Sequence, residues 1–367
     1  MICNSNSVSY SGSRSTELEG QAVHVPDGFF DVPVSVGAGV LATGALSVCL
    51  RGARRELDDR TAPMAGLVAA FIFAVQMLNF PVAAGTSGHL LGGALAAILV
   101  GPYTAVLCVA VVLLVQAFFF ADGGLTALGV NITLMAVVTT IVGWAVFRLV
   151  TRWGPRRRGV IVGASFAAAL ISVPAAALCF TALFWLGGTA PIEVSSVALA
   201  MGGVHLLIGL GEGLITALTV SSVLAVRPDL VYGARGLAAP LVLRTAVGEV
   251  TVAAQEPAPA RNRGRGPRPI LVGGGLVALL LAGVVSFYAS SAPDGLNKVA
   301  QDKGFNANEK AQPLENGPLA GYSVKGVSDE RLSGGLAGVA GVGLTVLAGG
   351  GVFYVVRRRR RDDRAVA

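Results

Sequence analysis

The strongest constraint in this sequence is its succession of long apolar segments separated by short polar ones. Hydrophobic residues make up 53% of the 367 residues and charged residues only 13%, about half the share of roughly 25% in soluble domains. The mean hydropathy is +0.69. Because a helix that crosses a bilayer needs about 20 predominantly apolar residues, we expect an all-α polytopic membrane protein. The same composition excludes a soluble enzyme, a disordered tail and a nucleic-acid-binding module.

Nine segments approach or exceed the length of a membrane span. Seven lie before residue 230 and two after residue 269. The segment 88–100 is short for a full crossing. It is either tilted or one half of a re-entrant pair joined to the next segment at Gly101-Pro102. The nine segments are 32–50, 62–82, 88–100, 102–121, 129–150, 160–187, 201–226, 270–289 and 336–356.

Basic residues are concentrated in particular loops between these segments. With nine crossings, most of the 28 Lys and Arg residues lie on one side, in the loops after the first, fifth and seventh spans and in the C-terminal tail. Cytoplasmic loops carry an excess of Lys and Arg. We therefore expect a multi-pass protein of the cell membrane with its N-terminus outside and its C-terminus in the cytoplasm.

The polar segments divide the chain into domains. The Ser-rich leader, 1–22, has no apolar core and is not a secretory signal peptide. The stretch 254–268 is rich in Pro, Gly and Arg, a composition typical of a linker. We predict a membrane domain at 23–230, a cytoplasmic linker at 231–269, a two-span domain at 270–356 and a basic tail at 357–367. An external segment of the second domain, about 290–334, holds all four lysines.

The three histidines of the chain all face the outside on this topology. His24 precedes the first span, His89 opens the third segment, and His205 lies near the outer end of the seventh. Imidazole is a preferred ligand of divalent nickel and cobalt. The alternative for each is a polar residue near the membrane interface or a packing histidine, and for His205 that alternative is favoured.

The surroundings of His24 and His89 strengthen the metal hypothesis. His89 ends the polar bend Gly85-Thr86-Ser87-Gly88-His89 between two apolar segments. Irregular backbone at membrane depth is tolerated only where it is buried in protein or lines a cavity. His24 is followed by the turn signal Pro26-Asp27-Gly28, which would hold the preceding segment in a fixed direction.

Few other polar groups lie in or beside the spans, and they are Gln116, Asp122, Asn131 and Glu212. Such groups are costly in a membrane and usually functional, but here an interhelical hydrogen bond is favoured over metal ligation. A P-loop needs the pattern GxxxxGK[ST], and no lysine precedes Lys298. Any ATP-driven work must therefore come from a partner.

Several motifs, in order, resemble the CbiM/NikM family, the substrate-binding S components of energy-coupling factor (ECF) transporters for cobalt and nickel. The first motif runs from Val23 to Phe29 and is similar to the family's opening sequence. The others are Thr86–Gly93, Asp122–Gly129, and His205 with Gly209–Glu212. The segment from Ser291 to Phe305 resembles the PDGLE domain, a two-span accessory unit related to CbiN/NikN, although Asn297 replaces its glutamate.

The resemblance implies a metal site built by the N-terminus. In the family the ligands are the terminal amine, the amide nitrogen and imidazole of the second residue, and a histidine from the loop after the second span. Carried over, these are the main chain of Val23, His24 and His89. Such a nitrogen-rich tetragonal site suits Ni(II), although the sequence leaves Ni²⁺ and Co²⁺ open. The candidates for supporting or gating roles are Asp27, Ser87, Gln116, Asn131, His205 and Glu212.

One feature departs from the family pattern. The amine of Met1 is separated from His24 by the polar leader and could not join the same chelate ring. A valine at position 23 is what a GTG start codon encodes when it is translated as an internal codon. We therefore expect the native chain to begin at position 23, as Met-His-Val-Pro-Asp-Gly.

These inferences combine into one predicted function. The chain would be an ECF-type S component that captures Ni²⁺ or Co²⁺ outside and passes it inward, with ATP hydrolysis supplied by ATPase subunits and coupled through a transmembrane T subunit. It would hold no permanent cofactor, lie in the lipid bilayer and bind no nucleic acid. The alternative is a stand-alone, proton-coupled metal carrier, for which Glu212 is the only mid-membrane carboxylate. A membrane scaffold is a third possibility, and it leaves the histidines unexplained.

Overall fold

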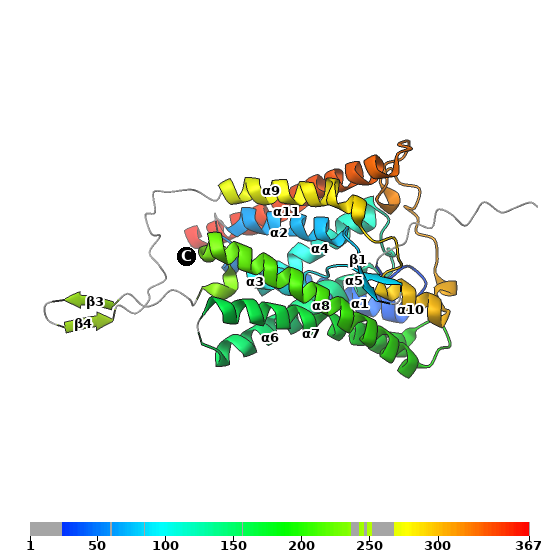
Figure 1. The fold of residues 1–367 in the computed structure, drawn as a ribbon, viewed down its shortest axis with the longest axis horizontal. Helices are drawn as coiled ribbons and strands as arrows, with labels where there is room; N and C mark the ends of the chain where they lie inside the picture. Colours follow the sequence, from blue (N-terminus) through cyan, green and yellow to red (C-terminus); the bar gives the residue numbers. More distant parts are fainter. Residues whose placement is uncertain are drawn as a thin grey trace, which may run out of the picture.

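The computed structural model describes residues 24–58, 61–83, 85–155, 157–235, 242–245, 248–251 and 268–366. Over these ranges the chain forms a bundle of long helices with two short β-hairpins (Figure 1). The elements up to residue 235 are α1 (Val32–Glu56), α2 (Thr61–Gln76), β1 (Phe80–Ala83), β2 (Thr86–Gly88), α3 (Gly93–Val100), α4 (Pro102–Phe119), α5 (Leu128–Asn131), the π-helical η1 (Ile132–Val138), α6 (Thr139–Trp153), α7 (Arg158–Gly187), α8 (Val194–Val226), η2 (Pro228–Leu230) and η3 (Tyr232–Ala234).

The remainder of the described chain contains the β3–β4 hairpin and the helices of the second domain. Its elements are β3 (Val242–Thr245), β4 (Gly248–Thr251), α9 (Arg268–Gly283), η4 (Val285–Tyr288), α10 (Gly295–Lys303), η5 (Phe305–Asn308), η6 (Ala320–Tyr322) and α11 (Glu330–Val366). The leader 1–22 and most of the linker 231–269 lie outside the described residues. Val231 and Ala234 are buried, so the packing of the first domain extends beyond residue 230, where we placed the start of the linker.

Seven helices of the described chain are long and apolar enough to cross a membrane. Five belong to the first domain, where α5, η1 and α6 form one of them, and two belong to the second. The predicted all-α polytopic architecture is confirmed. The predicted span 62–82 is shorter than expected, because α2 has 16 residues and extends about 24 Å before the chain turns into the β1–β2 hairpin.

The segment 88–100, expected to be short for a full crossing, forms a helix too short to span a membrane by itself. Its helix, α3, has eight residues, all of them buried, and extends only about 12 Å. Two glycines in left-handed backbone conformations bound the helix, Gly92 at φ 86° and Gly101 at φ 98°. A Cβ on Gly101 would lie 2.6 Å from the Glu56 carboxyl carbon, so the break between α3 and α4 depends on glycine.

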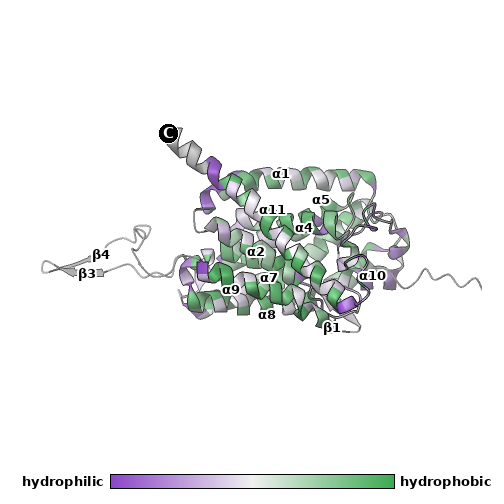
Figure 2. Cartoon of the chain, turned by 90° about the horizontal axis from the view of Figure 1, so that it is seen from above, coloured by the Kyte–Doolittle hydropathy of each residue, from purple (hydrophilic) through white to green (hydrophobic). Residues whose placement is uncertain are grey.

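The surface pattern fits a bilayer. Hydrophobic residues cover the length of the helices, and hydrophilic residues gather at the ends of the bundle (Figure 2). On α1 the large apolar side chains Val32, Val36 and Val40 are exposed at intervals of four residues, so they form one stripe along the helix. We assign this stripe to contact with lipid.

The second domain packs against several helices of the first. Helices α9 and α11 contact α2 and each other, and α11 also contacts α4. In Figure 1, α9 begins and α11 ends at one end of the bundle, whereas α10 lies at the opposite end. The segment between α9 and α11 therefore reaches the end of the first domain at which α1 begins.

An apolar cluster joins the two domains at this end. Phe305 of the second domain is 1% exposed, and its ring centroid lies 5.2 Å from that of Phe29 and 5.4 Å from that of Phe184. Burial of large aromatic side chains contributes strongly to stability. The cluster therefore holds the second domain over the segment that contains His24.

Candidate metal centre

His24 and His89 meet at the end of the bundle that the second domain covers. Their ring centroids lie 5.6 Å apart with the ring planes perpendicular, and both residues are buried. His24 lies in the extended segment before α1, whereas His89 lies between β2 and α3. The fold thus brings together the two histidines that the sequence singled out, while Val23 lies outside the described residues.

The segment around His24 is held by α5. The Val25 N–H donates to Oδ1 of Asn131 (3.0 Å), and Nδ2 of Asn131 donates back to the Val25 carbonyl (3.0 Å). The Gly124 N–H donates to the same carbonyl (2.9 Å). Asn131 therefore fixes the backbone next to His24 by paired hydrogen bonds, and it lines the same cavity as His89.

Asp27 connects the same segment to the loop after α4. Its Oδ1 accepts from the N–H and the hydroxyl of Thr126 (2.7 and 2.5 Å), and its Oδ2 accepts from the Leu125 N–H (3.2 Å). A Cβ on Gly124 would lie 2.3 Å from the Asp27 nitrogen. The Asp27 carboxylate is thus fully engaged in holding two backbone segments together.

The loop that carries His89 is held by Glu212 from α8. Its two carboxylate oxygens accept from the N–H groups of Leu91 (2.7 Å) and Gly92 (3.0 Å). Nδ1 of His89 lies 3.2 Å from the Leu90 carbonyl oxygen, which favours the tautomer protonated at Nδ1 and leaves the Nε2 lone pair free for a metal. Glu212 is therefore a positioning group for this loop.

Ser87 links the first domain to the second. Its N–H donates to the Pro293 carbonyl (2.8 Å), and its hydroxyl donates to the Ala292 carbonyl (2.7 Å). These bonds bring the buried carboxylate of Asp294 to 4.0 Å from Nε2 of His89. The second domain thus supplies a carboxylate beside the two histidines.

Asp122 is the closest acidic neighbour of His24. Its Oδ1 accepts from the His24 N–H (3.2 Å), and its Oδ2 lies 3.1 Å from Nδ1 of the His24 ring. Nδ1 therefore faces the Asp122 carboxylate as an ion pair, whereas Nε2 has no hydrogen-bond partner among the described residues. Buried polar atoms normally have one, so the open Nε2 points to a ligand.

His205 and Gln116 are connected to the candidate centre less directly. Nδ1 of His205 lies 2.8 Å from the Met201 carbonyl of its own helix, yet the residue lines the same cavity as His24 and His89. That cavity has a volume of about 60 Å³, which suits an ion and is far below the size of pockets for organic ligands. Gln116 does not line this cavity. Its main-chain carbonyl accepts from the Asp122 N–H (3.2 Å) at the end of α4.

The electrostatics of the two histidines differ. Burial lowers the pKa of His89 to about 4, and the nearby His24 lowers it further, so His89 is neutral near pH 7. Burial also lowers the pKa of His24, but the Asp122 carboxylate outweighs this effect and the net shift is upward. Burial raises the pKa of Asp294 to about 7. A metal ion needs neutral imidazoles, which His89 already provides.

Side chains alone do not complete a coordination sphere here. Among the described residues, no three His, Cys, Asp or Glu side chains converge as metal ligands. Two imidazoles therefore need main-chain nitrogens, or groups beyond the described ranges, as further ligands. This is the kind of ligand set that the family resemblance implies.

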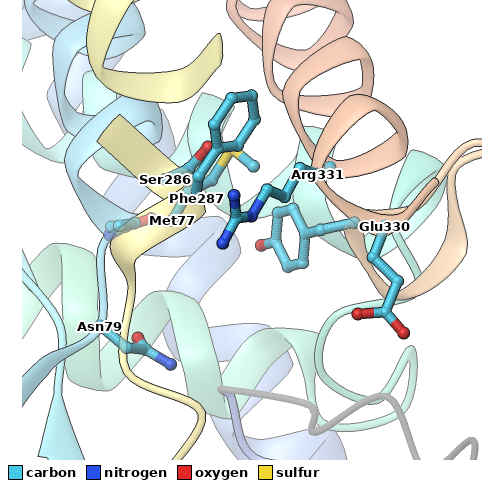
Figure 3. Close-up of a pocket in the computed structure, with 9 residues that line it drawn as sticks. Met77, Asn79, Ser286, Phe287, Glu330 and Arg331 are labelled. Carbon is cyan, nitrogen blue, oxygen red and sulfur yellow. The ribbon is translucent and has the colours of Figure 1, made fainter. Parts of the chain in front are cut away.

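A larger cavity of about 370 Å³ lies where the end of α2 meets the second domain (Figure 3). Its lining includes Met77, Asn79, Tyr322, Glu330 and Arg331. Figure 3 shows the Arg331 guanidinium extending into the space. None of the three histidines lines this cavity, and a fixed positive charge opposes a cation. The smaller cavity beside His24 therefore remains the candidate metal centre.

Sequence reasoning missed three residues at this centre. Asp122 was noted as a polar group at the end of a span and as the first residue of the motif Asp122–Gly129, without a role at the site. Asp294 was noted only within the PDGLE-like segment Ser291–Phe305, in the sequence Pro293-Asp294-Gly295. The Tyr322 hydroxyl donates to Oδ2 of Asp122 (2.5 Å). The Pro-Asp-Gly sequence occurs at both His24 and Asp294, which is a signal that could have paired the two segments. We find no sequence signal for Tyr322.

Comparison with known proteins gives consistent results. A family model described as the cobalt uptake substrate-specific transmembrane region, CbiM, matches residues 24–230. A model of the PDGLE domain matches residues 268–358. Both resemblances drawn from the sequence motifs are thereby confirmed.

Individual relatives agree with these matches. A putative metal transport protein of Haloquadratum walsbyi is 39% identical over 211 residues, covering 57% of this chain and 94% of that protein. A putative fused nickel transport protein, NikMN, of Archaeoglobus fulgidus is 39% identical over 209 residues, covering 57% of this chain and 68% of that protein. A crystal structure of a transition metal transporter is 27% identical with a TM-score of 0.50, covering 55% of this chain and 93% of that one.

Proposed function

Because this chain belongs to the CbiM family of cobalt uptake substrate-specific transmembrane regions, we propose that it captures Ni²⁺ or Co²⁺ between His24 and His89 and passes the ion across the cell membrane. The observation that carries the proposal is the pair of buried imidazoles beside a cavity of about 60 Å³. Nε2 of His24 has no hydrogen-bond partner among the described residues. A divalent ion would supply that partner.

The proposed ligands are the main chain of residue 23, His24 and His89. Nitrogen ligands of this kind suit nickel and cobalt better than the hard cations Mg²⁺ and Ca²⁺. The family description names cobalt, and the relative from Archaeoglobus fulgidus is named for nickel. We therefore propose both ions as substrates and no permanent cofactor.

We further propose that the ion is captured from outside and that partners drive its release. The energy would come from ECF ATPase subunits coupled through a transmembrane T subunit. The Arg-rich loops and tail support a cytoplasmic C-terminus under the positive-inside rule. The alternative, a proton-coupled carrier, needs a relay carboxylate in the membrane. Glu212 is poorly suited to that task, since both of its oxygens accept backbone N–H groups.

Metal titration of two forms of the chain tests the ligand set. One form begins at Met1 and the other begins Met-His at position 23. We expect tight Ni²⁺ and Co²⁺ binding with a visible d–d band only in the shorter form, because only there does a terminal amine adjoin His24. Equal binding by both forms would exclude the amine as a ligand. If neither form bound either ion, the proposed function would be wrong.

The affinity for Ni²⁺ is expected to fall as the pH is lowered, because the metal must displace the proton of His24. Asp122 and Asp294 raise the pKa of His24, whereas burial lowers it. In Asp122→Asn the main raising influence is absent, so the fall should begin at a lower pH than in the wild type. Affinities measured between about pH 5.5 and 8 check this shift. Coincident profiles would contradict it.

A further inference from the structure

We propose that Tyr322, in the second domain, is a positioning residue of the metal centre in the first domain and acts through Asp122 on His24. The inference rests on the proposed function. It goes beyond that function by assigning to the second domain a specific hydrogen bond at the site.

The contacts form a continuous chain from one domain to the other. The Tyr322 hydroxyl donates to Oδ2 of Asp122 (2.5 Å). Asp122 in turn accepts the His24 N–H (3.2 Å) at Oδ1, and its Oδ2 lies 3.1 Å from Nδ1 of the His24 ring. One carboxylate thus faces both the main chain and the ring of the same proposed ligand. In metal sites a carboxylate beside a ligating histidine orients the ring.

The backbone is strained at both ends of this series of contacts, once in each domain. Ala121 has φ 54° and Tyr322 has φ 56°, and they are the two non-glycine residues with positive φ in the described part of the chain. A left-handed conformation is unfavourable for a residue with a Cβ. The Gly321 N–H donates to the Phe120 carbonyl (2.9 Å), so the two strained turns are also joined directly. Strain of this kind persists where the surroundings require one geometry.

The Tyr322 ring is held independently of its hydroxyl. It stacks on Phe120 with the ring centroids 5.0 Å apart and an interplanar angle of 25°, and its centroid lies 6.4 Å from that of Phe73. Because these contacts involve the ring and not the hydroxyl, Tyr322→Phe preserves the packing and removes the hydrogen bond to Asp122. The variant therefore separates positioning of His24 from stability of the domain interface.

The experiment is a double-mutant cycle on Ni²⁺ binding, in the form of the full chain that binds the ion. The variants are Tyr322→Phe, Asp122→Asn and their combination, with Tyr288→Phe as the matched control, since Tyr288 is an exposed tyrosine of the same domain. The d–d band reports the geometry of the bound ion, and loss of that band after addition of a chelator gives the dissociation rate. Thermal unfolding without metal checks that each variant is folded.

We expect Tyr322→Phe to bind one ion with an affinity about tenfold lower, a shifted d–d band and faster dissociation, because lost outer partners of metal ligands cost about 10–100-fold. Combined with Asp122→Asn, it should add nothing further. Tyr288→Phe should match the wild type. An unchanged Tyr322→Phe, or additive losses in the double variant, would overturn the role of Tyr322 and leave the proposed function intact. A wild-type chain that binds no metal would overturn both.

Discussion

Replacing either His24 or His89 by alanine is expected to abolish tight binding of Ni²⁺ and Co²⁺. Each substitution removes one of the two imidazoles that face each other across 5.6 Å. Loss of an outer partner of a metal ligand already costs about 10–100-fold in affinity, so loss of a ligand should cost more than about 100-fold. The measurement is metal titration of each purified variant, followed by the d–d band.

His205→Ala is the matched control for this prediction. His205 lines the same cavity, but its Nδ1 lies 2.8 Å from the carbonyl of Met201 in its own helix. We therefore expect its substitution to change the affinity by no more than a few-fold. The opposite pattern, with binding lost in His205→Ala and kept in His24→Ala, would require a different ligand set.

Glu212→Ala is expected to give the second large effect, a loss of both stability and metal affinity. Glu212 is completely buried, and its carboxylate accepts the N–H groups of Leu91 and Gly92. The variant leaves both donors buried without an acceptor, at a cost of about 1–3 kcal/mol each. The loop that follows His89 then loses its anchor. Thermal unfolding of the metal-free chain and Ni²⁺ titration measure the two effects.

Two further variants serve as an intermediate case and as a control for this prediction. Glu212→Gln keeps one oxygen acceptor and should lie between the wild type and Glu212→Ala in both measurements. Glu330→Ala removes a carboxylate from an exposed position and should leave both quantities unchanged. If Glu212→Ala unfolded at the same temperature as the wild type, the two backbone hydrogen bonds would not be anchoring this loop.

The helices were predictable because hydropathy and length are local properties of the sequence. The predicted span 129–150 corresponds to the helix Leu128–Trp153, and the predicted span 102–121 corresponds to α4. The segment 88–100 was expected to be short for a full crossing, and the structure gives the reason: Gly92 and Gly101 have left-handed backbone conformations that leave only eight helical residues between them. The composition of α3 shows that the segment is apolar. It does not show the backbone angles of the two glycines at the ends of the helix.

The candidate metal centre was likewise predictable only in part. The sequence by itself determined the membrane-spanning helices and, through motifs, identified His24 and His89 as candidate ligands. Only the tertiary structure decided that Asp122, Asp294 and Tyr322 lie around them. The hydrogen bond from Tyr322 to Asp122 joins residues 200 positions apart, and it forms because α9 and α11 pack on α2. Helical periodicity relates residues only three or four positions apart, so contacts across a domain boundary depend on packing that no local pattern encodes.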